Sequence, residues 1–227
     1  RLPDISRILY VALSLRILII IIGHYFVPLP DSTKDAAGFE SLAWTYGQDG
    51  FLSAIGHFPE NIRYFWSMII GILYSLFGRS ILMAQSLSLL LGIGIIFLVW
   101  SLAKKIWDKD KAIKVAWIVA LFPSLLLYSV LPLKDIYQSF FLLVAFTGIF
   151  YWVQDGSFKY IALAMFGFIL ATLFHGALII GGIIFLIIVI FEELKKTIKS
   201  ILNSRLNIKA FLVIFVAIFV LQFFFLN

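Results

Sequence analysis

The stretch ISRILYVALSLRILIIIIGHYFVPL, residues 5–29, decides the fold, because it is long and apolar enough to cross a bilayer. It is followed at once by PDSTKDAAGFESLAWTYGQDG, residues 30–50. No other segment of the chain has acids so dense with so few cations beside them. Its carboxylates belong to Asp31, Asp35, Glu40 and Asp49. Acids placed directly after a membrane helix indicate chemistry at the boundary between lipid and water.

The composition of the whole chain supports a membrane protein. Of its 227 residues, 63% are hydrophobic and only 13% are charged, and the mean hydropathy is +1.06. Soluble domains are nearer half apolar and a quarter charged. The apolar runs are continuous rather than alternating, which predicts spanning helices instead of a barrel. The chain has no cysteine, which excludes disulfides and thiolate chemistry.

We expect an all-α, polytopic helical membrane protein with about seven transmembrane helices. They form a single transmembrane domain over residues 1–227, and the chain ends inside an apolar run, so we expect a C-terminal truncation. The predicted spans are Ile5–Pro28, Ser80–Ala103, Ala112–Leu131, Ile136–Val153, Phe158–Phe174, Ala177–Phe191 and Ile208–Leu226.

One further apolar run, Tyr64–Gly78, is about 22 Å long as a helix, short of the roughly 30 Å hydrocarbon core. The positive-inside rule decides how to treat it. With a cytoplasmic N-terminus and no span here, most of the 18 lysines and arginines lie inside. If the run did span, the cluster KKIWDKDKAIK would move outside. We therefore predict a long outer loop over residues 29–79 that contains amphipathic juxtamembrane helices.

Two amphipathic helices are expected outside the spans. In AAGFESLAWTY the residues Phe39, Leu42, Ala43 and Tyr46 share one helical face, and Asp35 precedes them in a capping position. A basic segment over residues 192–207 has apolar residues at helical spacing. We expect it to be a cytoplasmic surface helix that serves mainly as a topology signal.

Asp35 and Asp135 are the candidate catalytic residues, because both are predicted on the outer side. A carboxylate there can deprotonate a hydroxyl or bind a divalent cation such as Mg²⁺ or Mn²⁺. The alternative is that each only caps a helix. Asp31 and Asp49 are interpreted as turn formers. Glu40 lies little more than one helical turn beyond Asp35 and is a candidate for the same pocket.

Several cations are candidates for substrate binding. Arg16 lies well inside a span, where a charge either faces a polar cavity or partner or extends toward the cytoplasm. His175 ends the fifth predicted span, where an ordinary interfacial hydrogen bond is the alternative. The outer cations Arg63, Arg79 and Lys134 can hold a phosphate or simply anchor helix ends.

The order of these features resembles the GT-C superfamily of membrane glycosyltransferases, which includes protein mannosyltransferases and aminoarabinose transferases. Four passages carry the resemblance, which covers roughly residues 5–151. They are SLRILII with the acidic loop PDSTKDAAGFESLAW, the outer helix RYFWSMIIGILYSLFGRS, the basic inner loop SLAKKIWDKDKA, and ALFPSLLLYSVLPLKD. The sequence departs from the family in having D-x-x-x-D in place of a tight acidic pair.

The resemblance implies a sugar donor linked to polyprenyl phosphate and an acceptor that is a lipid, glycan or protein. It matches Asp35 to the catalytic base or metal ligand of the first outer loop, and Asp135 to the acid of the second. The spacing of Asp31 and Asp35 leaves open which of them is the counterpart and whether a metal is needed. The family uses no nucleotide sugar.

Two other classes remain in view. A non-catalytic subunit of a larger membrane complex could keep this fold as a scaffold, and a transporter could use the helix breakers Pro123 and Gly181-Gly182. Membrane lipid is an expected partner in every case, and nucleic acid is not. The Ile, Phe and Lys bias favours the bacterial plasma (inner) membrane.

Overall fold

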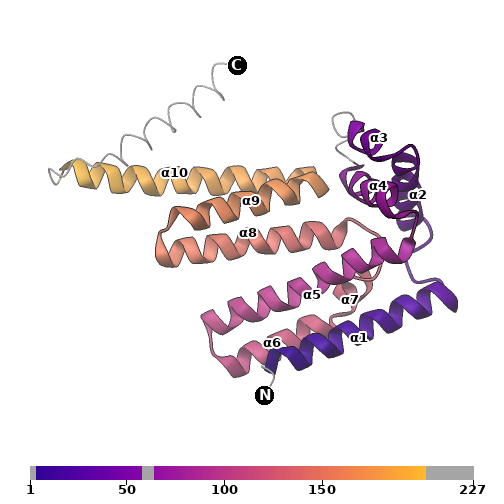
Figure 1. The fold of residues 1–227 in the computed structure, drawn as a ribbon. Coiled ribbons are helices and arrows are strands. Elements are labelled where there is room, and N and C mark those ends of the chain that lie inside the picture. Colours follow the sequence, from indigo (N-terminus) through magenta and orange to yellow (C-terminus); the bar gives the residue numbers. More distant parts are fainter. Residues whose placement is uncertain (1–3, 58–63, 203–227) are drawn as a thin grey trace. The chain divides into compact units, whose positions relative to one another are not determined.

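The computed structural model describes residues 4–57 and 64–202, and throughout these ranges the regular structure is helical (Figure 1). The chain divides into two units, Arg1–Leu178 and Ile179–Asn227. The elements of the first are α1 (Asp4–Tyr25), α2 (Asp35–Gly47), α3 (Phe51–Gly56), α4 (Phe65–Phe77), α5 (Ile81–Ile106), α6 (Lys109–Leu121), α7 (Pro123–Tyr128), α8 (Asp135–Asp155), α9 (Phe158–Phe174) and η2 (Gly176–Leu178). The second unit contributes α10 (Ile179–Leu202).

Four helices are long and apolar enough to cross a membrane: Ile5–Tyr25, Ile81–Ile106, Asp135–Asp155 and Gly176–Lys199. Together they indicate a multi-pass integral membrane protein of the helical type. Two shorter apolar helices, α4 and α9, fall below this length. The seven expected spans are thus not confirmed as a set. The predicted span Ile208–Leu226 lies outside the described residues.

The predicted span Ala112–Leu131 is not one continuous helix. Helix α6 ends at Leu121, and the six-residue α7 starts at Pro123 after the extended residue Phe122. Proline has no N–H to donate and its ring clashes with the preceding turn, so it disfavours helical geometry in the residue before it. The chain then turns back, and α8 begins at Asp135.

Helices α2, α3 and α4 form one cluster (Figure 1), in which α4 packs along α2. Helices α2 and α4 confirm the two helices expected between the first two long apolar helices, and the short α3 was not expected. The buried row of α2 is Ala36, Glu40, Ala43, Tyr46 and Gly47. The buried face of α2 therefore differs from the predicted apolar face, because the acidic Glu40 is buried and Leu42 is only half-buried.

The long helices pack through small residues and a shared aromatic core. A Cβ atom added at Gly167 of α9 would lie 2.5 Å from the backbone nitrogen of Ala145 in α8, so only glycine permits this close approach. The main core joins α2, α4, α5, α8 and α9 through residues such as Trp66, Tyr74, Ile95 and Phe174. A second apolar cluster joins α1, α5 and α6.

In the second unit, α10 runs without a break from Ile179 to Leu202. The predicted basic helix over residues 192–207 is therefore the continuation of an apolar helix as far as Leu202, and residues 203–207 lie outside the described part. Its acids pair with lysines one turn later, Glu192 with Lys195 at 3.0 Å and Glu193 with Lys196. These are ordinary surface pairs on a helix.

Candidate functional site

The loop after α1 and the turn after α7 meet beside the start of α2. Ala36 of α2 packs against Leu131 and Leu133 of the turn, and all three side chains are buried. This contact brings together the two loops that were predicted to lie on one side of the membrane. The acids Asp31, Asp35 and Asp135 all belong to these segments.

Asp31 and Asp135 both lie near Tyr128. The Tyr128 hydroxyl donates a hydrogen bond of 3.0 Å to Asp31 Oδ2. This bond and the Asp31 charge raise the pKa of Tyr128, with a smaller contribution from the Asp135 charge. Asp31 has a φ of 60°, which fits its interpretation as a turn residue. Tyr128, which the sequence analysis did not single out, thus binds the Asp31 carboxylate directly and feels the charge of Asp135.

Asp35 is the first residue of α2, and its exposed side chain borders an open depression of about 510 Å³. No side-chain hydrogen bond caps the helix at Lys34, the residue before it. Lys134 of the second loop does not line the depression, but its Nζ lies 5.3 Å from the centre of the ring of Phe39, which does. The depression is lined by Lys34, Asp35, Gly38, Phe39, Ser41, Leu42, Thr45 and Tyr64.

Glu40 forms a two-point ion pair with Arg79. Arg79 Nε donates to Glu40 Oε1 at 3.0 Å and Nη2 donates to Oε2 at 2.7 Å. The Tyr74 hydroxyl adds a third hydrogen bond to Oε1 at 3.0 Å. The Arg79 hydrogen bond holds the pKa of Glu40 below its usual range, against the opposing effect of burial. Two predicted substrate-binding residues therefore bind each other, and the pair joins α2 to the start of α5.

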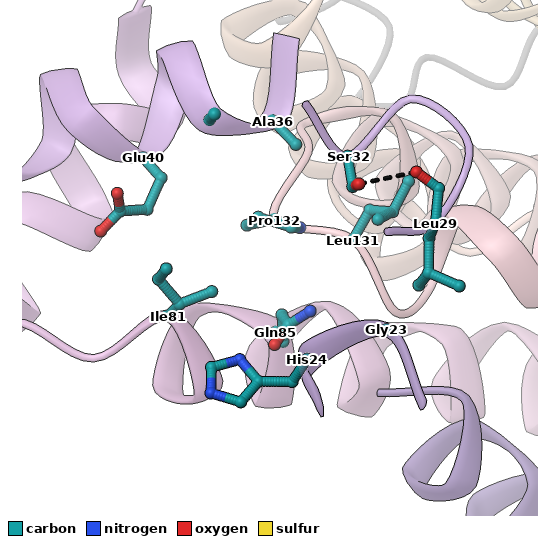
Figure 2. A pocket seen from close by; sticks show the side chains of 11 residues that line it. Gly23, His24, Leu29, Ser32, Ala36, Glu40, Ile81, Gln85, Leu131 and Pro132 are labelled. Carbon is teal, nitrogen blue, oxygen red and sulfur yellow. Dashed lines mark hydrogen bonds between the residues drawn. The ribbon is translucent and has the colours of Figure 1, made fainter. Parts of the chain in front are cut away.

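Glu40 also lines a second pocket of about 220 Å³ (Figure 2), which shares no lining residue with the Asp35 depression. Glu40 projects from α2, whereas Ile81 and Gln85 project from α5 and His24 from the last turn of α1. The expectation that Glu40 shares a pocket with Asp35 is therefore not met. Five positions on a helix separate the two side chains by more than a third of a turn, so they face different sides of α2.

Arg16 is buried inside the first unit, with a relative exposure of 1%. Its Nε donates to Ser129 Oγ at 2.8 Å, and its Nη1 donates to the carbonyls of Ala12 and Ala120, both at 3.2 Å. Ala120 stands next to the end of α6, where the break at Pro123 leaves carbonyls without helical donors. Arg16 thus supplies a hydrogen-bond donor to a carbonyl at the broken end of α6. It lines neither pocket.

Of the two remaining candidates, only His175 is among the described residues, and it lines neither pocket. His175 is exposed at the C-terminal end of α9, and Arg63 lies outside the described residues. Among residues 4–57 and 64–202, no three His, Cys, Asp or Glu side chains are grouped as metal ligands would be. The assignment of Asp35 and Asp135 as metal ligands stays a prediction, because Mg²⁺ is commonly held by one or two carboxylates together with water and substrate phosphates.

Tyr74, Gln85 and Tyr128 were not predicted as site residues. Each forms a hydrogen bond with a residue at least 34 positions away in the sequence. Tyr74 pairs with Glu40, Gln85 with the Val130 carbonyl, and Tyr128 with Asp31. No periodicity or motif marks such a pairing. Comparisons with family models, curated proteins and solved structures give no match to this chain. The functional conclusion therefore rests on the residues themselves.

Proposed function

We propose that the protein transfers a sugar from a polyprenyl-phosphate donor to a hydroxyl-bearing acceptor, a lipid, a glycan or a protein, at the outer face of the membrane. The observation that carries the proposal is the depression that combines the exposed carboxylate of Asp35 with Lys34 at its rim and Lys134 beside Phe39. Its volume of about 510 Å³ lies within the range of small-molecule sites, roughly 300 to 1,000 Å³.

The residues have complementary roles in this reaction. Asp35 accepts the proton of the acceptor hydroxyl, whose oxygen attacks the anomeric carbon of the donor sugar. The bond from that carbon to the phosphate oxygen breaks, and the phosphate leaves with the electron pair. Lys34 and Lys134 stabilise the negative charge that develops on the leaving phosphate. Asp135 and Asp31 orient Tyr128 and the turn that carries Lys134.

The first test substitutes the proposed base. The purified protein is reconstituted with polyprenyl-phosphate sugars carrying a radiolabel, and transfer to a lipid, glycan or peptide acceptor is measured. Loss of a general base typically lowers a rate by about 10² to 10⁴-fold, which is the expected effect of Asp35→Asn. Asp49→Asn is the matched control, because Asp49 is an exposed acid of the same loop outside the depression. Asp35→Asn protein that transfers sugar at the wild-type rate contradicts the assignment.

A scaffold subunit is the second candidate, and one observation favours it. The carboxylate of Glu40 is fully engaged by Arg79 and Tyr74, so part of the predicted site is already filled by the protein itself. In this case Asp35→Asn and Asp135→Asn change only stability, and the protein copurifies with other membrane subunits. The helix break at Pro123 suggested a transporter, but Arg16 donates a hydrogen bond to the Ala120 carbonyl beside this break. No specific observation therefore favours a transporter.

A further inference from the structure

The second pocket, the one of about 220 Å³ that Glu40 lines, has in its wall a buried amide oxygen without a hydrogen-bond partner. Gln85 is 7% exposed, and its Nε2 donates to the Val130 carbonyl at 3.0 Å. A carbonyl can only accept, so this bond identifies the other amide atom as the oxygen. Among the described residues nothing donates to Gln85 Oε1, although this residue lines the pocket. An unpaired buried acceptor is costly, and a ligand donor would relieve that cost.

Ser32 and Glu40 of the pocket wall also accept hydrogen bonds, and the imidazole of His24 can donate as well as accept. Ser32 uses its proton on the Leu29 carbonyl at 2.6 Å, so the hydroxyl oxygen keeps its free lone pairs. Glu40 is already paired with Arg79, and the pair is neutral as a unit. A ligand with hydroxyl donors fits this wall. An ammonium group finds no unpaired carboxylate in the lining, and a phosphate finds no lysine or arginine there.

The rest of the lining is apolar, which limits the ligand further. The side chains of Leu29, Ile81, Leu131 and Pro132 supply hydrocarbon surface beside the polar groups. A sugar ring has hydroxyls at its edge and C–H groups on its faces, so it matches both kinds of surface. The volume of about 220 Å³ is below the roughly 300 Å³ of typical small-molecule sites. It therefore suits a single ring.

We propose that this pocket is a binding site for one neutral sugar ring, with a ring hydroxyl donating to Gln85 Oε1. The site is distinct from the Asp35 depression, because Ala36, Ala37 and Glu40 of α2 line the pocket while Asp35, Gly38 and Ser41 line the depression. The inference concerns binding and stands whether or not the protein transfers sugar.

The place of the pocket in the fold allows two sources for the ring. His24 lies in the last turn of one candidate span, and Ile81 is the first residue of another. The pocket is thus at the ends of spans, where the headgroup of a glycolipid would lie. A free sugar has the same ring chemistry. The two sources are separated by experiment.

The test measures binding to the full chain in phosphatidylcholine nanodiscs. In one arm, methyl glycosides of glucose, galactose and mannose are titrated and detected by saturation-transfer NMR. In the other, the same discs contain a glucosyl diacylglycerol, and the rise in unfolding temperature is recorded. Gln85→Met removes the acceptor, and we expect binding to weaken roughly tenfold. Ala37→Phe fills the pocket from an exposed helix position and is expected to abolish binding.

The matched control is Gln138→Met, because Gln138 Oε1 is also buried and unpaired but lies outside the pocket. It is expected to leave binding unchanged. Binding in either arm that both pocket variants weaken supports the site and identifies the source. Absence of binding in both arms, or binding that Gln85→Met leaves unchanged, overturns it, and the pocket then holds only water. If the protein binds the sugar but transfers none, the proposed enzyme is refuted and this site is not. If both pocket variants still transfer sugar, that result does not rescue a site that failed the binding test.

Discussion

Glu40 shows how a single acid can belong to the structure and to a site at once. Its side chain is 5% exposed and accepts three hydrogen bonds, two from Arg79 and one from Tyr74. A buried carboxylate is tolerated only when it is paired in this way. Arg16 is the counterpart among the cations, because it donates to the Ala120 carbonyl beside the break between α6 and α7 and to the Ser129 hydroxyl.

The ion pair predicts a defined pH dependence of stability. The folded-state pKa of Glu40 is lowered, so its stabilising effect is present above its unfolded pKa and is lost as pH falls through the folded pKa. Glu40→Gln should lower the free energy of unfolding by about 1 kcal/mol at pH 7, a modest value because the Arg79 side chain is 45% exposed. The measurement is denaturant unfolding in detergent at pH 7 and at successively lower pH.

Once Glu40 is protonated in the wild type, the difference between the two proteins should shrink. Asp49→Asn is again the control, because this exposed acid should show little effect at either pH. A difference between the wild type and Glu40→Gln that is constant across the whole range would contradict the role of the charge.

At the scale of the element, small residues decide how closely helices approach. Gly148 of α8 and Gly167 of α9 each face backbone atoms of the other helix, and a Cβ at either position would lie 2.5 Å from a backbone nitrogen. Backbone cannot move aside as a flexible side chain can. The α8–α9 pair is the most extensively packed helix pair of the described residues.

Gly167→Ala should therefore destabilise the protein by about 1 to 3 kcal/mol through overpacking. Gly38→Ala in α2 is the matched control, since a Cβ there meets nothing within 4 Å. It should be neutral or stabilise by roughly 0.5 to 1 kcal/mol through higher helix propensity. Unfolding free energies of the two variants in the same detergent test this. Equal effects would show that helix propensity, not close packing, governs both positions.

At the scale of the whole molecule, the arrangement of loops across the membrane is the property that the proposed function needs. Helix α5 has the length of a span, so its two ends should lie on opposite sides of the bilayer. A lysine cluster begins in the last turn of α5 with Lys104 and Lys105 and continues in α6 with Lys109, Lys111 and Lys114. The positive-inside rule predicts that this cluster lies in the cytoplasm and the acidic loop outside.

Because the chain has no cysteine, single cysteines report this topology directly. Asp49→Cys should react with a membrane-impermeant maleimide in intact cells, and Asp110→Cys only after permeabilisation. Both positions are exposed, so access to the reagent depends on the side of the membrane. Labelling of both from outside would show that α5 does not span, and the reverse pattern would put the acidic loop in the cytoplasm.

The sequence alone determined the features that depend on neighbouring residues. The apolar runs predicted the long helices, and the short run Tyr64–Gly78 predicted the helix Phe65–Phe77. Hydropathy and helix capping act over a few residues, which is why these predictions succeed. The span Ala112–Leu131 was misjudged because the apolar pattern continues through Pro123, while the backbone cannot.

Only the tertiary structure decided which side chains meet. Arg79 lies 39 residues from Glu40, Tyr128 lies 97 from Asp31, and Ser129 lies 113 from Arg16. Such pairs depend on how helices pack and on which buried polar atoms still need partners, and neither is encoded in a local period. For the same reason the acidic loop was recognised from its residues, whereas the pairing of Glu40 with Arg79 and Tyr74 emerged only from packing.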